Sequence, residues 1–125
     1  MAEIADVITH APVPACEICE TAVIRNAGKR PYDIDALRTI EAVKLRVDSG
    51  QMRYVRADAP LEDMVALAES ELTYTINSYL ECRQCRRTWF WGLCIRGAPV
   101  YKPVEADAPA KHLWQVVPAR ERWAR

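Results

Sequence analysis

The chain has 125 residues, half of them apolar, and its 17 basic and 17 acidic side chains cancel to a formal net charge of zero. This length predicts a single domain, residues 1–125, with a modest core. The charge balance lacks the basic excess usual in nucleic-acid-binding domains, and no run of about 20 apolar residues is present to span a bilayer.

Residues 1–15 are expected to form a flexible segment, because Pro12 and Pro14 interrupt it. Residues 1–14 carry no Lys or Arg and lack the basic region and apolar stretch of a secretory signal. We therefore expect a cytoplasmic protein with reduced cysteines, a setting that favours a metal site over disulfides.

A helix and a strand are predicted after the first pair of cysteines. Asp33 is the candidate N-cap, and the helix would end at Ser49 and Gly50. Its apolar positions recur at helical spacing: Ile34, Leu37, Ile40, Val43 and Val47. The alternative is a hairpin in which residues 43–47 form a strand that turns at residues 48–50. In both interpretations residues 52–56 alternate and form a strand.

A second helix and three more strands are predicted in the remainder. Asp58 and Pro60 indicate the helix start, with Asp58 as its cap. The apolar face of this helix, up to about Ser70, consists of Leu61, Met64, Val65, Leu67 and Ala68. From Leu72 the apolar period changes to two, which predicts strands at residues 72–80, 87–95 and 100–104.

Together these elements predict an α+β fold with two helices and an antiparallel sheet of three or four strands. Residues 16–104 would form the core of the domain. Residues 105–125 would be a C-terminal extension that contributes one docked segment.

The cysteines fall into two Cys-x-x-Cys steps separated by 62 residues, Cys16 with Cys19 and Cys82 with Cys85. This spacing lets one turn direct two thiolates at a tetrahedral ion, so two turns complete a zinc-ribbon-like site without an open position. The long loop adds only about 1 kcal/mol of closure entropy, whereas a structural zinc supplies on the order of 10 kcal/mol or more. These four cysteines are therefore the predicted ligands of one structural Zn²⁺.

Three alternatives to zinc stay open at this point: a disulfide pair, a redox dithiol and cysteines that fill the core. Arg83, Arg86 and Arg87 would lower a thiol pKa in a redox site, and they would equally stabilise thiolates bound to zinc. The fifth cysteine, Cys94, lies in an apolar run and is expected to be a buried thiol.

Candidates for catalysis are few, and we predict that the protein is not an enzyme. His10 and His112 lie at opposite ends of the chain, where either could replace a zinc ligand. None of the three serines stands in a nucleophile elbow, and no glycine-rich phosphate loop is present.

The charges are arranged in two blocks. Residues 57–81 contain six acidic and no basic side chains, and residues 82–103 contain five basic and no acidic ones. The blocks either neutralise each other across the fold or steer a charged partner. The candidate partner-binding residues are Glu62, Asp63 and Glu69 on the second helix and Arg86, Arg87 and Trp89 after the second turn. Alternatively, Trp89 belongs to the core face of a central strand.

The chain resembles small bacterial proteins with a split Cys-x-x-Cys pair, some of which are similar to immunity proteins of polymorphic or contact-dependent toxin systems. The matching pieces are the cysteine steps, the first helix and residues 50–55, 58–63 and 79–86. The chain departs from common zinc knuckles in having Glu20 and Arg86, not Gly, after the second cysteine of each turn. The resemblance implies a partner-binding protein that blocks a toxin.

We therefore expect a non-catalytic, zinc-stabilised protein that sequesters a protein partner, such as an immunity protein or antitoxin. The alternative is a nucleic-acid-binding zinc ribbon in which Arg83, Arg86, Arg87 and nearby aromatic side chains contact single-stranded nucleic acid. A thiol oxidoreductase is a third hypothesis and requires a free dithiol.

Overall fold

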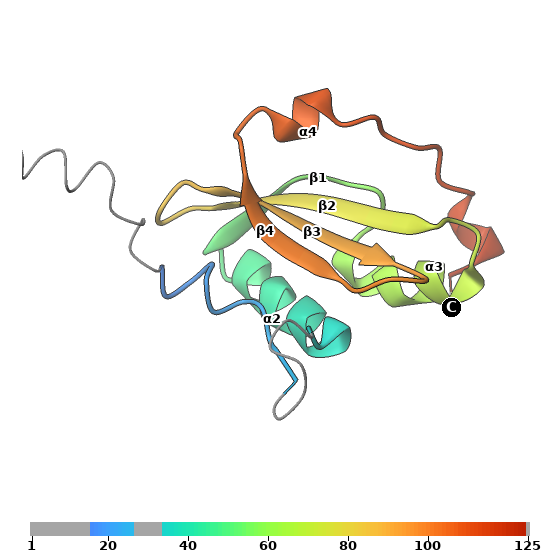
Figure 1. Cartoon of the computed structure of the whole chain (residues 1–125), viewed down its shortest axis with the longest axis horizontal. Coiled ribbons are helices and arrows are strands. Elements are labelled where there is room, and N and C mark those ends of the chain that lie inside the picture. The colour runs from blue at the N-terminus through green and yellow to red at the C-terminus, as the bar shows by residue number, and fades with distance from the viewer. Residues whose placement is uncertain (1–15, 27–33, 125) are drawn as a thin grey trace, which may run out of the picture.

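The computed structural model describes residues 16–26 and 34–124. Within them, four strands form one antiparallel sheet in which neighbours in the chain are neighbours in space, as Figure 1 shows. The strands are β1 (Met52–Ala57), β2 (Thr75–Cys82), β3 (Thr88–Cys94) and β4 (Val100–Val104). This meander confirms the predicted α+β class with an antiparallel sheet. The last strand has the predicted bounds, whereas β2 begins three residues after Leu72.

Two helices cover one face of the sheet, α2 (Ala36–Asp48) and α3 (Met64–Ser70), and the 3-10 turn η1 (Leu61–Asp63) precedes α3 (Figure 1). Between helices and sheet lies the core, to which β2 contributes Ile76 and Leu80 and β3 contributes Trp91, all without solvent exposure. Their alternation along the strands is the period of two that the sequence indicates.

Helix α2 confirms the helical interpretation of this region, and the alternative hairpin is wrong. Its N-cap is Asp35, whose side chain accepts a hydrogen bond from the Arg38 backbone N–H at 3.0 Å. The predicted cap, Asp33, lies outside the described residues. At the other end Ser49 is the C-cap, and Gly50 has a φ of 82° that favours glycine.

The predicted cap of α3 is wrong. Asp58 instead accepts a hydrogen bond from the backbone N–H of Asn77 at 2.7 Å and one from the Gln115 side chain at 3.1 Å. The chain enters α3 through η1, which begins after Pro60. The Asp58 carboxylate, which local spacing assigned to the helix N-terminus, is thus hydrogen-bonded to the backbone of β2, which is distant in the sequence.

The segment after β4 crosses the outer face of the sheet and then reaches η1 (Figure 1). It contains the short helix α4 (Ala108–Lys111) and the 3-10 turn η2 (Arg120–Arg122). Tyr79, on the outer face of β2, places its hydroxyl 3.0 Å from Nδ1 of His112, and its ring meets that of Trp114 edge-on at 5.7 Å. Arg56 lies over the Trp114 ring at 4.5 Å. The C-terminal segment therefore contacts both the outer face of the sheet and η1.

No helix in the described ranges is both long enough and apolar enough to cross a membrane.

Candidate metal centre

The four cysteines of the two Cys-x-x-Cys steps converge on one point. Their sulfur atoms all lie within 4.8 Å of one another, with Cys16 to Cys82 at 3.7 Å and Cys19 to Cys85 at 3.4 Å. A disulfide would need about 2.05 Å, and all four thiols are free. Sulfurs bound at about 2.3 Å to a tetrahedral ion lie about 3.8 Å apart, which is close to the observed spacing. The cluster could therefore hold one metal ion.

The two turns share a backbone pattern. The N–H of Glu20 donates to the carbonyl of Cys16 at 2.9 Å, and the N–H of Arg86 donates to that of Cys82 at 2.8 Å. Each turn thus closes from the residue after its second cysteine back to its first, so both thiols of a step point the same way. The second turn is also the connection between β2 and β3, where the N–H of Cys82 donates to the carbonyl of Arg87 at 2.9 Å.

Arg86 adopts a φ of 67°, in the left-handed region that glycine occupies most easily. The sequence departs from common zinc knuckles at this position, and the backbone conformation that glycine would supply is nevertheless present. A side chain in this region costs roughly 1–2 kcal/mol, so the rest of the turn holds Arg86 in a strained conformation.

The first turn lies outside the sheet and is held by side chains from two other elements. The hydroxyl of Tyr101, on β4, donates to the carbonyl of Cys19 at 2.8 Å. From α2, Arg46 donates through Nε to the carbonyl of Ile18 at 2.7 Å and through a second nitrogen to Oγ1 of Thr21 at 3.0 Å. Helix and sheet therefore place the first pair of thiols opposite the second.

A salt bridge joins the two turns directly. Glu20 follows the first step, Arg87 lies two residues after the second, and their side chains form an ion pair. The hydrogen bond to Glu20, together with the negative charge of that carboxylate, raises the pKa of Arg87 against the effect of burial. The guanidinium thus places positive charge beside a site that carries excess negative charge once four thiolates surround a divalent ion.

Protonation of the cysteines is uneven when no metal is bound. The backbone N–H of Cys19 lowers the pKa of Cys16 to about 7, against the effect of burial. Burial is the largest cause that raises the pKa of both Cys19 and Cys82. Four adjacent thiolates would repel one another in this setting, whereas a bound cation deprotonates coordinating thiols. The donor set therefore fits a thiophilic divalent ion.

The site is also closed to further ligands. Cys16 is 6% exposed, Cys19 and Cys82 are not exposed at all, and Cys85 is half-buried. Four sulfur donors fill a tetrahedral coordination sphere, which leaves no position for a substrate or a reactive water. The geometry suits a metal that stabilises the fold.

The predicted partner-binding residues divide into exposed and enclosed groups. Glu62, Glu69 and Arg86 are exposed. Asp63 is only 8% exposed and pairs with Arg120 through two hydrogen bonds of 2.8 and 3.1 Å. Trp89 is 3% exposed and stacks on Tyr101 with ring centres 4.5 Å apart. The sequence left open whether Trp89 belongs to the core, and in the structure it does. Arg87 is largely enclosed beside Glu20.

Cys94 lies apart from the four-sulfur cluster and is half-buried, less enclosed than expected. A hydrogen bond from Tyr74 lowers the pKa of this thiol. His112 is engaged with Tyr79 on the outer face of the sheet, and His10 lies outside the described residues.

Sequence reasoning missed the residues that support the first turn, Tyr101 and Arg46, because no local pattern indicates such distant contacts. The ion pair of Glu20 with Arg87 could have been inferred from the sequence. These opposite charges follow the two cysteine steps closely, and turns that bind the same ion lie next to each other.

Comparisons of the chain with protein-family models, curated proteins and solved structures gave no match. The site is therefore interpreted from its own geometry.

Proposed function

We propose that this protein is a non-catalytic binding protein, fastened by one structural zinc ion, that sequesters a protein partner in the manner of an immunity protein or antitoxin. The closed four-sulfur cluster carries the proposal, because it is suited to stabilising a fold and leaves no position for metal catalysis. Zinc is the proposed ion, since tetrahedral sites with four thiolates are typical of it.

Binding through the acidic helix rests on charge. From Leu61 to Glu71 the chain has four acidic side chains and no Lys or Arg. Asp63 is neutralised by Arg120, so Glu62 and Glu69 are the predicted contact residues that remain exposed there. An acidic surface of this kind can occupy a basic cleft on a partner and accelerate its association.

The decisive test is native mass spectrometry of the tagged protein, purified from its own cells with nuclease and without chelator. We expect a complex that contains one zinc ion and a second polypeptide. The double variant Glu62→Lys, Glu69→Lys should lose the partner or bind it more slowly. Its matched control, Glu105→Lys with Glu121→Lys, changes the net charge equally on the C-terminal segment and should bind normally. A lone zinc-bound chain would refute sequestration while leaving the metal site intact.

The second candidate is a nucleic-acid-binding zinc ribbon. Arg83 and Arg86 are exposed at the cysteine turn, with Arg86 72% exposed, so a basic surface exists there. The burial of Trp89 removes the aromatic side chain that would have stacked on bases. This function predicts binding to single-stranded DNA or RNA that weakens steeply with salt and is lost in Arg83→Glu, Arg86→Glu. Absence of binding at low salt would exclude it.

A further inference from the structure

One of the four cysteines of the metal centre is more accessible than the others. The other three are buried, whereas Cys85 is half-buried. Its neighbours in the turn, Gln84 and Arg86, are both exposed to solvent. Cys85 is therefore the ligand cysteine that a small reagent in solution reaches most readily.

The sulfur atoms also face one another across the two steps. Sγ of Cys19 lies 3.4 Å from Sγ of Cys85, and Sγ of Cys16 lies 3.7 Å from Sγ of Cys82. A disulfide needs about 2.05 Å, so a small movement of the two side chains would join Cys19 to Cys85. A second thiol thus lies beside the accessible one and can react with it once it is oxidised.

Contacts of the protein itself keep the two turns next to each other. Glu20, in the first turn, pairs with Arg87, just after the second. The hydroxyl of Tyr101 donates to the carbonyl of Cys19 at 2.8 Å and so holds the first turn against β4. Cys19 should therefore remain beside Cys85 while sulfur ligands are lost one at a time.

We infer that Cys85 is a site of oxidation by hydrogen peroxide, and that the reaction ends in a disulfide between Cys19 and Cys85 and in loss of the zinc ion. The inference rests on the zinc ion of the proposed function, and it adds a condition under which the protein releases that ion. Accessible thiolates beside a second thiol are typical of peroxide-sensitive cysteines. A bound divalent ion keeps the Cys85 sulfur deprotonated, which is the nucleophilic form.

The reaction consumes one molecule of peroxide. The Cys85 sulfur attacks one peroxide oxygen, the O–O bond breaks, hydroxide leaves, and Cys85 becomes a sulfenic acid. The Cys19 thiolate then attacks this sulfur, so that the S–S bond forms, the S–O bond breaks and a second hydroxide leaves. Two protons from solvent convert both hydroxides to water. Two thiolates are oxidised, the peroxide is reduced, and the two remaining sulfurs are too few for a closed tetrahedral site.

The oxidised protein differs from a protein that has lost its metal to a chelator. The disulfide links the first turn covalently to the connection between β2 and β3, in place of the ion. Residues 16–26 should therefore keep their protection from hydrogen exchange after oxidation. Loss of this protection to the same degree as in the chelator-stripped protein would overturn the inference.

The first test treats the zinc-loaded protein with one equivalent of hydrogen peroxide and follows zinc release with a metallochromic indicator. One zinc ion should be released for each disulfide formed. Peptide mapping without reductant identifies the pairing, because proteases specific for Glu and Arg cleave within the two steps, after Glu17 and Arg83. The peptide of Cys19 should be linked to that of Cys85. Retention of zinc, or a different main pairing of the four cysteines, would overturn the inference.

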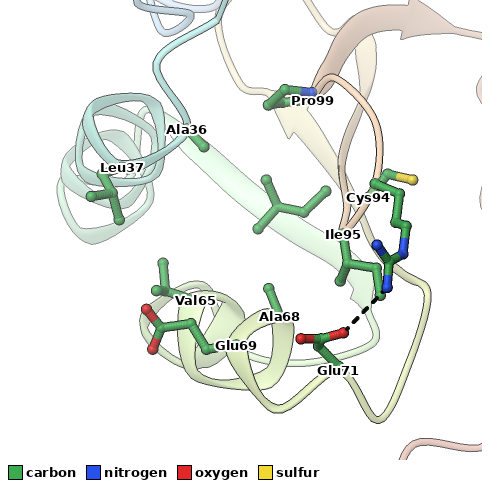
Figure 2. Close-up of a pocket in the computed structure, with 11 residues that line it drawn as sticks. Ala36, Leu37, Val65, Ala68, Glu69, Glu71, Cys94, Ile95 and Pro99 are labelled. Atoms are coloured by element: carbon green, nitrogen blue, oxygen red, sulfur yellow. Dashed lines mark ion pairs between the residues drawn. The ribbon is translucent and has the colours of Figure 1, made fainter.

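Cys94 provides the matched control. It is half-buried like Cys85, lies outside the four-sulfur cluster, and lines the groove between α2, α3 and the connection from β3 to β4 (Figure 2). The Cys94→Ser variant should release zinc at the rate and with the yield of the wild type. The sulfenic-acid reagent dimedone, added with the peroxide, should label Cys85 in both proteins. Loss of zinc release in Cys94→Ser, or dimedone labelling that spares Cys85, would overturn the inference.

Failure of this inference and failure of the proposed function give different results. A chain that binds no zinc refutes the structural zinc ion, and this inference with it, before peroxide is added. A loaded chain that keeps its zinc in peroxide refutes this inference alone and leaves the structural ion and partner sequestration intact.

Discussion

Arg86 shows at the scale of one residue how the second cysteine turn is constrained. Its φ of 67° lies in the left-handed region, and among the described residues its 72% exposed side chain pairs only with Glu81, at 4.0 Å. The conformation is thus required by the turn and is not compensated by a strong contact. Neighbouring backbone groups fix it, since its own N–H closes the turn on Cys82.

Replacing Arg86 by glycine should therefore stabilise the protein. We expect Arg86→Gly to raise the free energy of unfolding by about 1 kcal/mol, because glycine removes the left-handed penalty. The measurement is the urea midpoint at a fixed zinc concentration. Gly50→Ala is a control in which the opposite effect on stability is expected. Gly50 has a φ of 82°, and no atom lies within 4 Å of an added Cβ. It should lose about 1 kcal/mol through backbone strain alone. A lower midpoint for Arg86→Gly would contradict this account.

At the scale of elements, the C-terminal segment is attached to η1 by the pair of Asp63 and Arg120. The hydrogen bond from Arg120 is the main cause that lowers the pKa of Asp63 from 3.8. A carboxyl group with a lowered pKa stabilises the fold fully above its unfolded pKa. That contribution is lost as the pH falls below 3.8 and through the folded pKa.

The Asp63→Asn variant should consequently melt a few degrees below the wild type at neutral pH. The difference should stay constant down to about pH 5 and close as the pH falls below about 4. Thermal melts across this range test it. Asp48→Asn serves as the control, since Asp48 pairs with Lys44 on an exposed helix face, where ion pairs contribute little. A pH-independent difference for Asp63→Asn would show that the charge pair is not its source.

The elements that the sequence predicts correctly are those in which the spacing of apolar residues indicates which face of the element is buried. The alternation in β3 and the helical spacing in α2 locate both elements without reference to the rest of the chain. The predicted cap of α3 failed because Asp58 is engaged by a distant partner, the backbone of β2. The pairing of Asp63 with Arg120, 57 residues away, likewise has no local pattern that could indicate it. The cysteine spacing did predict the cluster. One tetrahedral ion requires four sulfur ligands, so two separate Cys-x-x-Cys steps indicate a contact between distant parts of the chain.

At the scale of the whole molecule, the cluster joins two parts of the chain that the sheet does not connect. Residues 16–26 belong to none of the four strands, and their hydrogen bonds run mainly to side chains of α2 and β4. The other two sulfurs belong to β2 and to the connection between β2 and β3. An ion held by all four would therefore fasten residues 16–26 onto a sheet that is already formed.

Zinc should accordingly stabilise the protein by mass action on the folded state. At free zinc a thousandfold above its dissociation constant the gain is about 4 kcal/mol, which corresponds to a rise in Tm on the order of 15 °C. Melts of the zinc-loaded and chelator-stripped protein measure this gain, and hydrogen exchange should show residues 16–26 losing protection first on stripping. Cys85→Ser should abolish the response to zinc, whereas Cys94→Ser, outside the cluster, should retain it. If loaded and stripped protein melt together, the cluster is four packed thiols, and the contacts of Tyr101, Arg46 and Glu20 alone hold the first turn.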